Sequence, residues 1–347
     1  MTKIKNFNTL VLLCGTMILL LAACSGNGTK ENKTASKDSL EKPRWVDPQR
    51  GKFFEKVNIV QIPLTAIENH MLGPVKSVRY RDYKLAGKDS TKVLDDSGYN
   101  VYDKYGHLVD QNEYKADGTP KWKCIYKYDS NNKAVEWSFN FYTDTYSTHT
   151  TFTYDDKGNK TTVKTESTNP KYSGRGEYKY DSRGNEIQAT GYNGQGKVIR
   201  ITSYRYDDRN FQIQMTMRDG DGNLLRKAIQ DYDNNGDKTG GSEYISDTTI
   251  SGKWAATLDN KGRTIETVGY DKDGKIFGRS KIKYDEWDNV TESISYKPDG
   301  AVDTASWNTY TDFIYDSHGN ATKETWYKLN GNKKEILGIT EREYEYY

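Results

Sequence analysis

The chain has 347 residues, of which 51 are basic and 49 acidic, and its formal net charge is +2. Charges of both signs are interspersed, which argues against nucleic acid as a partner because phosphate binding requires a net or clustered positive field. Only 34% of the residues are hydrophobic, and 28 residues are tyrosine. The low aliphatic content alone would favour disorder, but the aromatic content and a regular repeat favour a folded domain.

The first residues have the features of a targeting segment. Lys3 and Lys5 precede an apolar run at residues 10–21, which is too short to span a bilayer comfortably and is typical of a signal peptide. The run ends in Leu-Ala-Ala-Cys24, which resembles the lipoprotein box of bacteria, where the cysteine receives diacylglycerol and cleavage occurs just before it. The resemblance implies lipidation of Cys24, with acyl chains such as palmitate holding the protein to a membrane. An uncleaved anchor or an ordinary signal peptide is the alternative.

Four segments are expected along the chain. Residues 1–23 form the signal peptide, and residues 24–44 form the lipidated cysteine and a flexible polar tether. Residues 45–101 form an N-terminal cap that covers the open edge of the first repeat, and within it residues 73–85 alternate like a strand. Residues 102–347 form the repeat domain. We expect a protein anchored in the bacterial envelope, at the outer membrane, facing either the periplasm or the exterior.

The motif Tyr-Asp-x-x-Gly recurs through residues 102–347 in nine units. Most steps are 26 residues long and two are 31, a regularity that predicts a repeat architecture. The fourth residue after each motif tyrosine is Gly, Asn or Asp, the types that tolerate a left-handed backbone. The pattern predicts a type I turn closed by a bulge, with the aspartate accepting hydrogen bonds from the turn amides. These turn aspartates are Asp103, Asp129, Asp155, Asp181, Asp207, Asp233, Asp259, Asp285 and Asp316.

The residue pattern within each unit also predicts two strands and a second turn. Seven residues after each motif tyrosine, or after Leu258 where it replaces one, stands a β-branched residue, as a pleated surface favours: Val109, Val135, Thr161, Ile187, Ile213, Thr239, Ile265, Thr291 and Thr322. A second turn, such as Asp221-Gly222, follows in most units. The expected fold is all-β: one long antiparallel meander sheet of about eighteen strands, curved or spiralling like a solenoid and stabilised by an aromatic seam between neighbouring repeats.

The motif Tyr-Asp-x-x-Gly-Asn followed by a strand resembles the YD repeat of Rhs proteins and related cell-surface adhesion proteins. In that family the repeats form a spiralling β-shell, and some members enclose a toxin. A closer likeness is to short YD-type repeat lipoproteins of bacterial envelopes. The resemblance implies a β-repeat shell and points to carbohydrate or surface binding, but it supplies no catalytic residue.

Metal binding and catalysis have little support in the sequence. Asp219-x-Asp221-Gly and Asp271-x-Asp273-Gly match the start of a calcium loop, but neither has the acidic residue required at the twelfth position, so turns explain them better. The four histidines belong to no catalytic motif. Cys124 is the one unmodified cysteine expected in the mature protein and is predicted to be a packed residue. We expect a protein without cofactor or metal that is not an enzyme.

Six tryptophans lie outside the repeating positions and are candidate ligand contacts: Trp122, Trp137, Trp254, Trp287, Trp307 and Trp326. Exposed aromatic rings on a sheet suit sugars or protein partners, whereas local packing is the alternative. Trp287 stands inside a turn and is expected to project outward. We therefore predict an envelope lipoprotein that binds glycan or protein. An envelope spacer or assembly protein without a soluble ligand is the alternative, and a carbohydrate-active hydrolase, which would require paired carboxylates in a cleft, is the least favoured.

Overall fold

The computed structural model describes residues 71–86, 91–306, 308–330 and 333–347. These residues form a single sheet of twenty strands and one 3₁₀ turn, Pro170–Tyr172. The strands are β1 Val75–Ala86, β2 Thr91–Tyr102, β3 Leu108–Lys115, β4 Pro120–Tyr128, β5 Ala134–Phe141, β6 Tyr146–Tyr154, β7 Lys160–Ser167, β8 Gly174–Tyr180, β9 Glu186–Asn193, β10 Val198–Tyr206, β11 Gln212–Asp219, β12 Leu224–Tyr232, β13 Lys238–Tyr244, β14 Ile250–Leu258, β15 Thr264–Asp271, β16 Ile276–Tyr284, β17 Val290–Tyr296, β18 Thr309–Tyr315, β19 Ala321–Asn330 and β20 Lys333–Tyr346. The described part of the chain has no helix long and apolar enough to cross a membrane.

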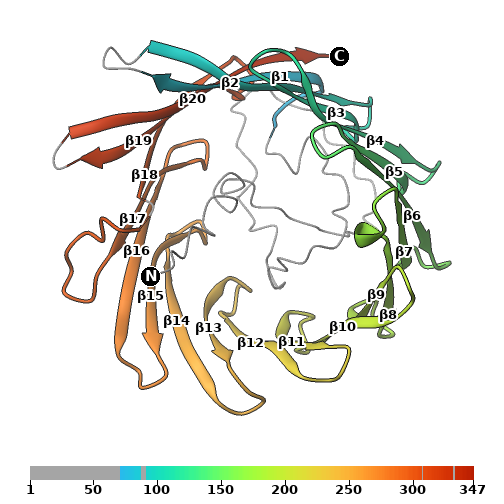
Figure 1. Ribbon diagram of the computed structural model, residues 1–347. Helices are drawn as coiled ribbons and strands as arrows, with labels where there is room; N and C mark the ends of the chain where they lie inside the picture. Colours follow the sequence, from blue (N-terminus) through green and yellow to red (C-terminus); the bar gives the residue numbers. More distant parts are fainter. Residues whose placement is uncertain (1–70, 87–90, 307, 331–332) are drawn as a thin grey trace, which may run out of the picture.

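The sheet closes on itself to form a barrel (Figure 1). Each strand pairs antiparallel with the next, which confirms the predicted all-β meander. Strand β1 pairs with β20 as well as β2, from Val75 opposite Tyr346 to Lys84 opposite Gly338. The predicted curvature of the sheet is therefore confirmed, but the sheet closes and does not continue as a spiral. Closure satisfies the backbone donors and acceptors that two free edges would leave unpaired.

The predicted N-terminal cap includes two strands of the barrel wall. Within residues 45–101, the segment from Val75 onward forms β1 and most of β2, so it closes the barrel and leaves no edge for a cap to cover. The strand predicted at residues 73–85 corresponds to β1. The signal peptide, the tether with Cys24 and the first part of the predicted cap lie outside the described residues.

The Tyr-Asp motifs form tight turns at all nine positions. The residue four positions after each motif tyrosine, or after Leu258, has a positive φ between 63° and 86°. These residues are Gly106, Asn132, Gly158, Gly184, Asn210, Gly236, Gly262, Asp288 and Gly319. In one example, the amide of Gly184 donates to the carbonyl of Asp181, and the carboxylate of Asp181 accepts from the amides of Arg183 and Asn185, both at 2.9 Å. The aspartate thus satisfies the turn's own backbone donors.

The β-branched residues that follow each turn occupy β-bulges. Tyr180 lies opposite Glu186 and Lys179 lies opposite Gln188, so that Ile187 is the extra residue of its strand. The same register shift occurs after each of the nine turns. Because a bulge bends its strand and increases the local twist, nine of them along one rim favour the curvature of a closed sheet.

The two faces of the sheet differ in chemistry. One face, here called the aromatic face, carries the motif tyrosines and the residues two and four positions before them, such as Cys124, Tyr126 and Tyr178, which are buried. The opposite or charged face carries the residues just before the motif tyrosines, such as Lys127 and Lys283, in exposed ion pairs. The described core therefore follows one face of the wall in separate clusters.

The two rims of the barrel also differ. The nine Tyr-Asp turns form one rim, here called the YD rim, and the described chain enters and ends there, since the amide of Tyr347 donates to the carbonyl of Pro74. The connections that depart from the repeat lie on the opposite rim, here called the variable rim. They include Tyr142–Thr145, residues 168–173 and residues 297–308. On other rigid scaffolds, the loops that vary often carry function, and the irregular connections of this barrel lie together on one rim.

Candidate functional site

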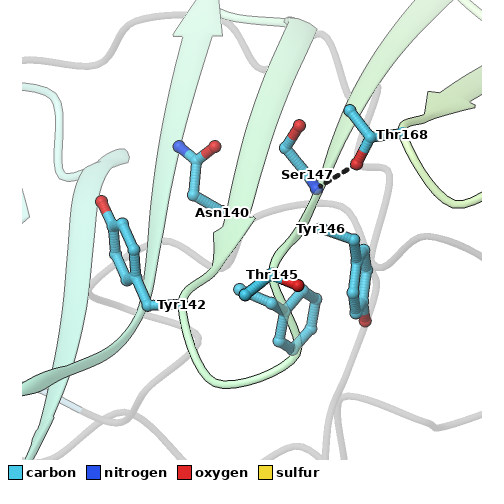
Figure 2. A pocket seen from close by; sticks show the side chains of 7 residues that line it. Asn140, Tyr142, Thr145, Tyr146, Ser147 and Thr168 are labelled. Atoms are coloured by element: carbon cyan, nitrogen blue, oxygen red, sulfur yellow. Dashed lines mark hydrogen bonds between the residues drawn. The ribbon is translucent and has the colours of Figure 1, made fainter.

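A groove on the variable rim is the best-formed candidate site. Strands β5 and β6 are joined by four residues, Tyr142–Thr145, where several other units have an Asp-Gly turn, and Thr145 has a φ of 53°. Strand β7 continues into the 3₁₀ turn, which Asn169 caps by accepting from the amide of Lys171. Two adjoining depressions of about 360 and 340 Å³ lie over β5–β7. Figure 2 shows the first of them, beside the β5–β6 connection. They are lined by Ser138, Asn140, Phe141, Tyr142, Thr145, Tyr146, Ser147, Thr148, His149, Glu166, Ser167 and Thr168.

Neutral polar side chains form the centre of the groove. Asn140 on β5 lies opposite Ser147 on β6, and the amide of Ser147 donates to the hydroxyl of Thr168 at 2.9 Å (Figure 2). The amide of Thr168 donates back to the carbonyl of Ser147 at 3.0 Å, which fixes these residues relative to one another. Within the described part of the chain, the side-chain amide of Asn140 makes no hydrogen bond. It can therefore donate to and accept from a ligand.

Aromatic rings support the rim end of the groove. The ring of Tyr146 stacks between Phe141 and Tyr172, with centroid separations of 4.4 and 4.6 Å. The stack continues through Phe139, which lies 4.0 Å from Phe141. Tyr142 is 49% exposed and Tyr172 is 43% exposed. The rim therefore combines a packed aromatic support with exposed rings that a ligand can reach.

The inner end of the groove contains a serine, a histidine and a glutamate in proximity. The hydroxyl of Ser138 lies 3.3 Å from Nδ1 of His149, and the carboxylate of Glu136 lies 3.8 Å from the same nitrogen. A hydrolytic triad requires the nucleophile at one ring nitrogen and the acid at the other. Because both partners face Nδ1, this arrangement does not orient the imidazole for that proton transfer.

The predicted tryptophans pack within the wall. Trp122 and Trp137 contact the core cluster around Tyr126, and Phe139 lies between them with centroid separations of 5.3 and 6.1 Å. Trp254 on β14 lies against Gly241 on β13, and Trp326 on β19 lies against Gly338 on β20. The structure thus brings two of the candidates together and leaves the others in separate parts of the wall. Trp307 lies outside the described residues.

The expectation that Trp287 projects outward is wrong. Its half-buried ring lies over Gly319 in the next Tyr-Asp turn and 5.5 Å from the ring of Tyr315. Gly319 has no side chain, so it leaves a flat backbone surface that the indole covers. Trp287 therefore packs between two neighbouring turns.

The predicted turn aspartates do not meet at a common centre. Each accepts backbone hydrogen bonds within its own turn, as Asp103 does from Tyr105 and His107 at 2.8 and 2.9 Å. In the described part of the chain, no three His, Cys, Asp or Glu side chains gather in a way that could hold a metal ion. Cys124 is buried on β4, and burial raises the pKa of its thiol to about 12, which keeps it protonated and unreactive.

Neither the groove with its exposed Tyr142 nor the exposed Tyr172 beside it was predicted from the sequence. The sequence carries a signal at this place: the units that begin at Tyr128 and Tyr154 have no Asp-Gly pair at the second turn, and the first of them has Tyr142 and Tyr146 there instead. A connection that departs from an otherwise regular repeat is not required by the fold, which makes it a candidate for function.

Comparison with known proteins places the chain in no family. No protein-family model matches it, and no curated protein matches it. Among solved structures it is similar to a porin-like protein from Bacteroides uniformis, at 14% identity and a TM-score of 0.34, covering 79% of this chain and 98% of that one. It is also similar to chains of the Photorhabdus luminescens Tc holotoxin pore (10% identity, TM-score 0.28) and of TcdB2–TccC3 (11%, 0.30). These two matches cover 74% and 75% of this chain, and 21% and 18% of the longer toxin chains.

Proposed function

We propose that this chain is a glycan-binding protein of the bacterial envelope, anchored through a lipid on Cys24, and that the groove over β5–β7 is its binding site. The observation that carries the proposal is the position of exposed Tyr142 beside Asn140, Ser147 and Thr168 in one shallow groove. Sugar rings present apolar faces that stack on aromatic side chains, and hydroxyl groups that pair with amides and hydroxyls.

The support beneath the groove suits such a ligand. Asn140, Ser147 and Thr168 lie on or beside strands that are hydrogen-bonded to neighbours on both sides. The aromatic stack from Phe139 to Tyr172 limits movement of the rim connection. A site held in place before the ligand arrives loses less conformational entropy on binding, which compensates for its shallowness.

The position of the groove fits presentation away from the anchor. The described chain begins beside the YD rim, where Leu72 both donates to and accepts from the side chain of Asn320, at 2.6 and 2.7 Å. A tether from Cys24 would join the barrel at that rim. The groove lies at the opposite rim and would then face away from the membrane, where a glycan can reach it.

A glycan array followed by calorimetric titration tests the proposal. Tyr142→Ala and Asn140→Ala are each expected to weaken binding roughly tenfold, since stacking and buried hydrogen bonds each contribute on the order of 1 kcal/mol. The matched control is Tyr105→Ala, which removes a tyrosine that is 61% exposed in a turn on the YD rim. An array without signals for the folded protein, or equal losses for Tyr142→Ala and the control, would refute a glycan site here. The spacer role would then be the better interpretation.

A further inference from the structure

We infer that the ligand is an uncharged oligosaccharide of at least two sugar units. The inference rests on the proposed function and adds the charge and the length of the ligand. Its evidence is the pairing of charges around the groove and the arrangement of the two depressions along β5.

On the strands beside the groove, charged side chains are paired with one another. Lys127 contacts Glu136 at 2.7 Å, and Lys164 contacts Glu166 at 2.6 Å. On the neighbouring strands of the same face, Lys123 contacts Asp110 at 3.3 Å. The lysine partners hold the pKa of Glu136 and of Glu166 below its usual range, so both carboxylates remain ionised at neutral pH. Two further charges lie at the rim end of the groove, Asp144 in the β5–β6 connection and Lys171 in the 3₁₀ turn, and they are of opposite sign. The groove therefore has charges of both signs at its edge, and neither sign is in excess.

This charge balance disfavours ionic sugars. A uronic acid or sulfated sugar that approached Lys127 or Lys164 would also meet the adjacent carboxylate, and a cationic amino sugar would meet the lysine. Exposed ion pairs are individually weak, so the pairs do not block the groove, but they offer no unopposed charge to recognise. The lining groups Ser138, Asn140, Ser147 and Thr168 each donate and accept, as sugar hydroxyl groups do.

The two depressions indicate the length of the ligand. They share Asn140, Ser147 and Thr168, and they differ in that one reaches Tyr142 and the other reaches Ser138, His149 and Glu166. Ser138 and Tyr142 are four residues apart on and just beyond β5, a distance of about 13 Å at 3.3 Å per residue. A single sugar ring cannot contact both ends, so full occupancy requires two or more linked rings. We name the ends the rim subsite and the inner subsite.

Calorimetry with defined oligosaccharides tests the inference. The probes are neutral gluco- and xylo-oligosaccharides of one to six units, oligogalacturonate, a sulfated heparin fragment and a chitosan oligomer. Each is measured at low salt and at roughly 0.5 M NaCl, which screens exposed charges. The expected result is neutral-glycan binding that is insensitive to salt and rises roughly tenfold from one unit to two or three.

Two variants separate the subsites. Ser138→Ala is expected to weaken binding of trisaccharides several-fold and to leave a monosaccharide at the rim subsite unaffected. Tyr142→Ala weakens both. Ser203→Ala, an exposed serine on the charged face of β10, is the matched control. Tighter, salt-sensitive binding of an acidic or cationic glycan, or affinity independent of length, would overturn the inference and leave the proposed function standing. If no probe binds the folded protein, the proposed function fails as well.

Discussion

The hydroxyl of Tyr180 donates a hydrogen bond to the carbonyl of Lys160, twenty residues earlier, at 2.8 Å. Lys160 is the first residue of the strand that follows the preceding Tyr-Asp turn. The same bond recurs from Tyr128 to Leu108, Tyr154 to Ala134, Tyr206 to Glu186, Tyr232 to Gln212 and Tyr284 to Thr264. In these six units the motif tyrosine therefore does more than fill a core, because it links its unit to the one before it.

Replacing this tyrosine by phenylalanine is expected to destabilise the barrel. Tyr180→Phe removes the hydroxyl and leaves the Lys160 carbonyl without this donor, at a cost of about 1–3 kcal/mol. Urea unfolding measures the change in the free energy of unfolding. Tyr105→Phe, at an exposed position in a turn, is the control and is expected to have little effect. Equal effects of the two substitutions would show that the recurring bond contributes nothing to stability.

Substitution of Gly319 tests the contact between neighbouring turns. Gly319 and Gly118 have similar positive φ values of 86° and 83°, so alanine is strained at both positions by roughly 1–2 kcal/mol. A Cβ at Gly319 would come closer than 3 Å to three ring atoms of Trp287, whereas at Gly118 it would meet nothing within 4 Å. Gly319→Ala is therefore expected to lower the free energy of unfolding by about 1–3 kcal/mol more than Gly118→Ala.

The double variant Gly319→Ala with Trp287→Ala provides the check on this explanation. Removing the indole should abolish most of the difference between the two glycines, because only backbone strain then remains. If the difference persists, the contact with Trp287 is not its cause. Trp287→Ala alone is the reference for the double variant, so thermal or urea unfolding of these four variants is sufficient.

Acid is expected to weaken the barrel through its turns. The side-chain amide of Asn159 and backbone amides of the turn donate to Asp155, and they lower the pKa of its carboxyl below the ordinary value of 3.8. Asn223 does the same for Asp219. Because the folded-state pKa is below the unfolded one, this stabilisation is fully present above about pH 4 and is lost as the pH falls through the folded pKa.

Unfolding measured from pH 6 to pH 2 should show this decline. Asp155→Asn cannot titrate, so its stability should fall less steeply below pH 4 than that of the wild-type protein, and the double variant with Asp219→Asn should fall less steeply still. Unchanged slopes would contradict an acid sensitivity that originates in the turns.

In the described part of the barrel, neighbouring strands β17 and β18 share the fewest paired residues. Among the described residues, two pairs join these strands, Glu292 with Tyr310 and Ser293 with Thr309, whereas β15 and β16 share five. Beyond these two pairs, the amide of Ser295 donates to the side chain of Asn308 at 2.6 Å. Hydrogen exchange measured by mass spectrometry is expected to be faster in β17 and β18 than in β15 and β16.

A cross-link provides the complementary measurement. Ser293→Cys with Thr309→Cys, at directly opposed positions, should form a disulfide and slow exchange in both strands. Thr267→Cys with Ser280→Cys on β15 and β16 is the matched control and should have little effect on β17 and β18. Uniform exchange around the barrel before cross-linking would exclude a weak point here.

Short-range features of this protein follow from its sequence. An aspartate followed three residues later by Gly, Asn or Asp specifies a turn through its own backbone preferences and hydrogen bonds, so Asp181 and Gly184 predict the local structure they adopt. The 26-residue spacing of these turns, with a second turn between them, predicts an antiparallel meander. Both inferences depend on contacts between residues close in the chain, and these contacts are visible in the order of the residues.

Only the tertiary structure decided that the sheet closes. The pairing of Val78 with Tyr344 joins residues more than 260 positions apart, and it depends on curvature accumulated over twenty strands, to which bulges at residues such as Ile187 contribute. No local sequence pattern encodes this accumulated curvature. For the same reason, the sequence did not show that Trp287 covers Gly319 or that Tyr142, Asn140 and Thr168 share a groove, since both depend on which residues adjacent strands and turns place beside one another.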